Sequence, residues 1–93
     1  MWTEFYDMYS GGNAKEKWTR IFIEAREDDA LAIFYNRFGH NPYRVTCTCC
    51  GPDYSIHECE TIERYIQMDN VLIIPASEIK PEERVSDIGL DQE

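Results

Sequence analysis

The feature that most constrains the fold is one amphipathic helical stripe set among strand-like stretches. Its apolar residues recur at i, i+3, i+4 and i+7 as Leu31, Phe34, Tyr35 and Phe38. That spacing places them on one face of a helix. Acidic residues at 27–29 suit the positive end of the helix dipole, and Gly39 stands where a glycine ends a helix. We therefore expect a helix over 26–39 whose apolar face packs against a sheet.

Several stretches on either side of this helix are typical of strands. Residues 2–9 are rich in aromatics, and residues 17–25 contain the β-branched and aromatic run Ile-Phe-Ile, so the two predict an opening hairpin. Residues 43–48 alternate in the manner of a strand, and residues 71–74 form a short apolar strand closed by Pro75.

A second helix is predicted from a capping box, with Ser55 as N-cap and Glu58 three residues on, running to about Met68. The element order is then β-β-α-β-α-β. This order predicts one α+β domain over 1–93 with a mostly antiparallel sheet and helices on one face. Near Pro81 we expect a short helical turn inside an acidic, partly frayed tail over 79–93.

The charge balance and the lack of long apolar runs argue against nucleic-acid binding and membrane binding. Nine Lys and Arg against 18 Asp and Glu give a net charge of −9 over 93 residues. Such a chain lacks the basic face that phosphate contacts require, so direct nucleic-acid binding is not expected. No apolar run approaches the roughly 20 residues of a membrane span, and residues 1–10 carry no basic-then-apolar signal. These features predict a cytoplasmic protein that does not bind membranes.

All four cysteines lie between positions 47 and 59, which suggests a metal-binding loop. Cys47 and Cys50 form a C-x-x-C pair followed by glycine, the shape of a zinc knuckle. His57 and Cys59 would complete a Cys₃His set for a structural zinc ion.

The helix and the zinc site conflict with each other. His57 and Cys59 share a face only in an extended segment, because on a helix they would lie about 200° apart. If one of them is not a ligand, the alternatives are Cys49, His40 and Asp53. The metal-free alternative makes Cys47 and Cys59 small core residues and leaves the other two cysteines as loop thiols.

Residues 37–56 (RFGHNPYRVTCTCCGPDYSI) resemble a stretch of small phage-encoded proteins of unknown function. The resemblance implies a phage or prophage origin and, with it, the cytoplasm of an infected host cell. In size and charge alone, the chain is also similar in kind to anti-CRISPR proteins. Those proteins mostly act by binding a host protein rather than by catalysis.

We therefore expect an inhibitor without enzymatic activity that docks on a basic, nucleic-acid-binding host protein, most specifically a CRISPR effector nuclease, and hinders DNA loading. Its acidic residues Glu58, Glu60 and Glu63 would steer the encounter, and Trp2 and Trp18 would anchor it. Two alternatives remain: a small metal-dependent or thiol enzyme using residues 47–59, and a phage structural or regulatory protein with a structural zinc. The sequence leaves the oligomeric state open.

Overall fold

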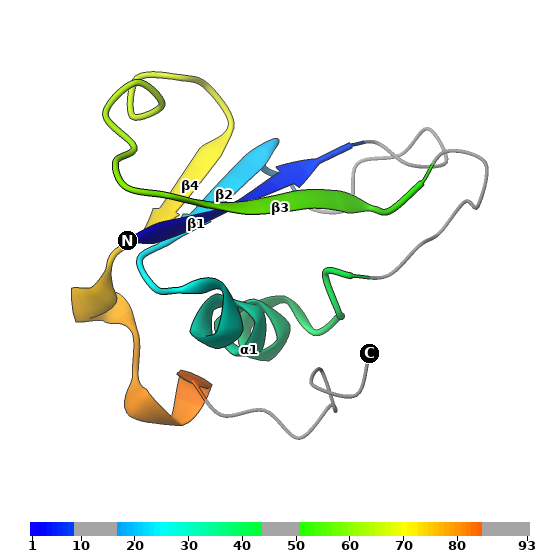
Figure 1. The fold of residues 1–93 in the computed structure, drawn as a ribbon, viewed down its shortest axis with the longest axis vertical. Helices are drawn as coiled ribbons and strands as arrows, with labels where there is room; N and C mark the ends of the chain where they lie inside the picture. The colour runs from blue at the N-terminus through cyan, green and yellow to red at the C-terminus, as the bar shows by residue number, and fades with distance from the viewer. Residues whose placement is uncertain (9–16, 44–50, 85–93) are drawn as a thin grey trace.

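The fold is a four-stranded sheet with one α-helix against it (Figure 1). The computed structural model describes residues 1–8, 17–43 and 51–84. The strands are β1 (Trp2–Asp7), β2 (Arg20–Ile23), β3 (Tyr54–Cys59) and β4 (Val71–Ile74), and the helix is α1 (Glu27–Phe38). The predicted α+β class is therefore confirmed.

The sheet is mixed, with the spatial order β3-β1-β2-β4. β1 pairs antiparallel with both neighbours, so that Phe5 faces Ile21 on one side and Ile56 on the other. β2 and β4 run parallel. β3 ends beside Trp2, whereas β4 begins beside Arg20 at the opposite end of the sheet. Residues 60–70 must therefore cross the sheet, and we call them the crossing segment.

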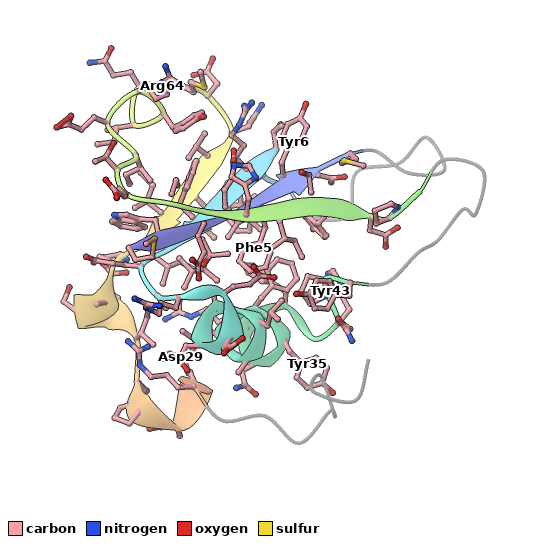
Figure 2. All side chains as sticks on the ribbon, viewed as in Figure 1. Phe5, Tyr6, Asp29, Tyr35, Tyr43 and Arg64 are labelled. Atoms are coloured by element: carbon pink, nitrogen blue, oxygen red, sulfur yellow. The ribbon has the colours of Figure 1, made fainter. Side chains whose placement is uncertain are left out.

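The core lies between α1 and one face of the sheet. Phe5 points toward α1 while Tyr6 points to the opposite side (Figure 2). The Phe5 and Phe34 rings lie 4.7 Å apart between centroids. Around them pack fully or nearly fully buried side chains from β2, α1 and β4: Ile21, Ile23, Ala30, Leu31, Ile33 and Ile74. Each large apolar side chain buried there contributes about 1.5–3 kcal/mol.

The ends of α1 follow the predicted signals. Three acidic residues occupy its first turn, and Gly39 adopts φ 79° while its N–H donates to the Tyr35 carbonyl. Two 3₁₀ turns, η2 (Ala76–Glu78) and η3 (Pro81–Arg84), follow β4. Arg37 of α1 binds Glu83 of η3 at 2.9 Å, which fastens this last part of the described chain to the helix. The helical turn predicted near Pro81 is confirmed.

The second predicted helix is wrong. Residues 54–59 form β3 instead, paired with β1 along its whole length, and the crossing segment that follows consists of turns. The capping box at Ser55 is a local preference, and long-range strand pairing overrides it. The described part of the chain therefore has one α-helix, and the predicted order β-β-α-β-α-β is not confirmed. Residues 44–48 of the predicted strand, and residues 85–93 of the tail, lie outside the described residues.

Candidate functional site

A buried carboxylate lies on the face of the sheet opposite α1 and contacts side chains from the two neighbouring strands. Glu4 lies in the middle of β1 and is only 3% exposed. Its Oε2 accepts a hydrogen bond from Nε of Arg20 at 2.9 Å, and its Oε1 lies 2.6 Å from Nε2 of His57. Strand register creates this arrangement, because His57 of β3 lies directly opposite Glu4. A buried carboxylate needs such partners to offset its lost hydration.

Arg20 also contacts two tyrosine rings. Its guanidinium carbon lies 4.7 Å from the ring centroid of Tyr6 and 5.4 Å from that of Tyr65. Each such contact between a cation and a ring contributes about 0.5–1 kcal/mol at partly exposed sites. These two contacts come from different parts of the chain. Through Arg20 they join β1 and β2 to the crossing segment.

The crossing segment lies over part of this face, and its side chains pack onto the sheet. Ile62 is buried, and the Tyr65 ring lies 5.0 Å from that of Phe22 on β2. The Met68 amide donates to the Tyr65 carbonyl, while Nη1 of Arg20 lies 3.8 Å from the Met68 sulfur. In Figure 2, Arg64 marks this segment, on the side of the sheet away from α1.

An open hollow of about 600 Å³ lies where the crossing segment leaves β3. Its lining consists of Cys59, Glu60, Thr61, Glu63, Arg64 and Tyr65. Partial burial and then the Glu4 carboxylate raise the pKa of the Cys59 thiol, outweighing the opposite effect of the N-terminal amine. This environment favours the neutral thiol of Cys59 over its thiolate.

The predicted zinc ligands are only partly described. His57 and Cys59 do share one face of an extended strand, as a common metal site requires, but Cys47, Cys49 and Cys50 lie outside the described residues. Among the described residues no group of three or more His, Cys, Asp or Glu side chains could hold a metal ion.

The alternative ligands lie elsewhere in the fold. The His40 ring packs edge-on against Phe34 of the core and stacks on Tyr54, so it belongs to the α1 side of the sheet. Asp53 is buried just before β3. His40 therefore does not share a face with His57 and Cys59.

The structure separates the three acids that were predicted to steer the encounter with a partner. Glu58 lies on β3, where its Oε2 accepts a hydrogen bond from the Glu27 amide in the first turn of α1. This contact satisfies one of the unpaired N–H groups of the helix start, so Glu58 has a structural role. Glu60 and Glu63 instead line the hollow on the crossing segment.

The two predicted tryptophan anchors do not form one patch. Trp2 is half-buried at the start of β1, opposite Cys59. Trp18 lies just before β2, near the other end of β1, and packs edge-on against Phe38 of α1 at 6.0 Å. Strand geometry puts the two ends of β1 about 17–20 Å apart.

Sequence reasoning missed the residues that form this site: Glu4, Tyr6, Arg20, Tyr65 and Met68. One signal was present, since Glu4 is a charged residue among the aromatic residues Trp2, Phe5 and Tyr6 of one strand. Its partners are 16 and 53 positions away in the chain, and local patterns do not reveal such pairs.

In comparisons with protein-family models, with curated proteins and with solved structures, nothing matches this chain. Among the described residues, no helix has the length and apolar character needed to span a membrane.

Proposed function

We propose that this protein is an inhibitor that binds another protein and turns over no substrate. Its target is a basic, nucleic-acid-binding host protein, most specifically a CRISPR effector nuclease whose DNA loading it hinders. The proposal places the protein in the cytoplasm of an infected cell, in line with the phage-like stretch over 37–56.

The observation that carries the proposal is the distribution of charge. Three arginines form ion pairs with acids of the same chain: Arg20 pairs with Glu4, Arg37 with Glu83 and Arg84 with Asp29. By contrast, Glu60, Glu63 and Asp69 of the crossing segment are exposed. The crossing segment therefore presents a net negative surface, in keeping with the net charge of −9.

An outward negative field favours encounter with a cationic groove. Such steering raises association rates by about 10- to 1000-fold and weakens as salt rises. A groove built to bind DNA carries the complementary charge, so this protein and DNA would compete for it.

A structural zinc ion held by Cys47, Cys50, His57 and Cys59 is part of the same proposal. Two observations support it: His57 and Cys59 lie on one strand face, and a carboxylate contacts one ring nitrogen of His57. Histidines that bind metals commonly make such a contact through the nitrogen that does not ligate. Native mass spectrometry tests this part, with one zinc per chain expected. A metal-free folded protein would contradict it.

Co-purification with a panel of CRISPR effector nucleases tests the function. We expect a complex at about 50 mM salt that weakens strongly by about 300 mM, together with loss of DNA loading. The double variant E60K/E63K should weaken the complex, whereas E78K/E82K, at exposed acids of η2 and η3, changes the net charge equally and is the matched control. Absence of a complex at low salt with every effector, or binding that ignores salt, would refute the proposal.

A further inference from the structure

Two apolar side chains project from the crossing segment into solvent. Ile66 is 55% exposed and Met68 is 46% exposed. Among the described residues, Ile66 is the most exposed large hydrophobic side chain. A single exposed apolar residue is ordinary on a protein surface, but these two lie in one turn next to the half-buried Tyr65.

We propose that this turn is the docking face and that it binds a basic amphipathic segment of the partner protein. Apolar residues of that segment would cover Ile66 and Met68, and its Lys or Arg side chains would reach Glu60, Glu63 and Asp69. The inference rests on the proposed function and names the surface and the chemistry of the partner.

The docking face is held in place before any partner arrives. Tyr65 packs on Phe22, the Met68 amide is bonded to the Tyr65 carbonyl, and Arg20 contacts the Met68 sulfur. A surface already ordered loses less conformational entropy on binding than a mobile one. Its composition also fits, because Tyr, Arg and Met are enriched in the buried centre of protein interfaces.

The charges around the docking face indicate which kind of partner segment can bind there. The crossing segment carries three exposed acids and one base, Arg64. A second copy of this chain would bring the same negative rim against it, and nucleic acid would be repelled. The complementary surface is an apolar strip bordered by positive charge, which an amphipathic helix rich in Lys or Arg presents.

Two synthetic peptides of about 18 residues, long enough for a helix, test the inference. Both contain the same numbers of Leu and Lys; one arranges them as an amphipathic helix and the other is scrambled. Fluorescence anisotropy at low salt should show the wild-type protein binding the arranged peptide at least about ten-fold more tightly. The double variant I66S/M68S should lose that preference, whereas M8S, at another exposed methionine, should retain it.

Mapping by ¹⁵N chemical shifts on the wild-type protein gives a second readout that does not depend on any variant. The shifts caused by the arranged peptide should centre on residues 60–70. Equal affinity for the two peptides, an unchanged preference in I66S/M68S, or shifts centred elsewhere would each overturn the docking face. Any of these results alongside a complex in the effector co-purification would leave the proposed function standing, whereas failure of that co-purification would remove the function itself.

Discussion

Replacing Arg20 by methionine would leave the buried Glu4 carboxylate without its arginine partner. The Nε–Oε2 distance of 2.9 Å corresponds to an attraction of roughly 6 kcal/mol at an effective dielectric of about 20. Arg20 is 28% exposed and His57 remains beside Glu4, so much of this value is offset by hydration and by the second contact. We expect a net loss of about 2–3 kcal/mol, with the lost ring contacts included.

Urea denaturation followed by circular dichroism measures this loss, and the melting temperature should fall by about 10–20 °C. R84M is the matched control. Its pair with Asp29 is 3.1 Å long but 33% and 50% exposed at the two side chains, so its loss should not exceed about 1 kcal/mol. E4Q should cost less than R20M, because it leaves the partly exposed Arg20 cation without its partner, whereas R20M leaves a buried anion with only His57 beside it.

The double variant E4Q/R20M completes a thermodynamic cycle. Since E4Q removes the buried charge that R20M leaves without its partner, the double variant should lose less stability than the two single variants combined. Additive losses would refute the reasoning, and so would an R20M variant as stable as R84M.

Three further predictions concern α1 and its contacts. G39A should cost about 1–2 kcal/mol in urea denaturation and G39N less, since φ is 79° and an added Cβ meets nothing within 4 Å; equal losses would contradict this. Burial tends to raise the pKa of Glu83, but the Lys80 amide and Arg37 lower it overall. The lowered pKa means that the ionised Glu83 stabilises the fold by about 0.5–1 kcal/mol. This contribution is complete above the ordinary pKa of 4.5 and is lost as pH falls through the lowered value. The difference in unfolding free energy between wild type and E83Q should therefore shrink in acid, and a constant difference would contradict this. Burial and the bond to Glu27 raise the pKa of Tyr43 to about 12, so its stabilising effect is complete below pH 10 and is lost as pH rises through about 12. The difference between absorbance titrations of wild type and Y43F should show the ionisation of Tyr43. A transition near pH 10 would count against the contact with Glu27.

Local patterns in the sequence were sufficient to predict several elements. The stripe containing Leu31 and Phe34, the acids before it and Gly39 after it identify α1, because helix periodicity and end signals act within a few residues. The same holds for the strand at residues 71–74 and for the turn at Pro81. The net charge, which motivates the proposed partner class, is likewise a property of the sequence alone.

Only the tertiary structure decided what residues 54–59 become and which side chains form the candidate site. Ser55 and Glu58 favour a helix start locally, but pairing along the whole of β1 stabilises the strand. The site joins Glu4, Arg20 and His57, which come from three strands. Which residues lie opposite one another depends on strand order and register, and these are set by the burial of one sheet face against α1 rather than by any local pattern.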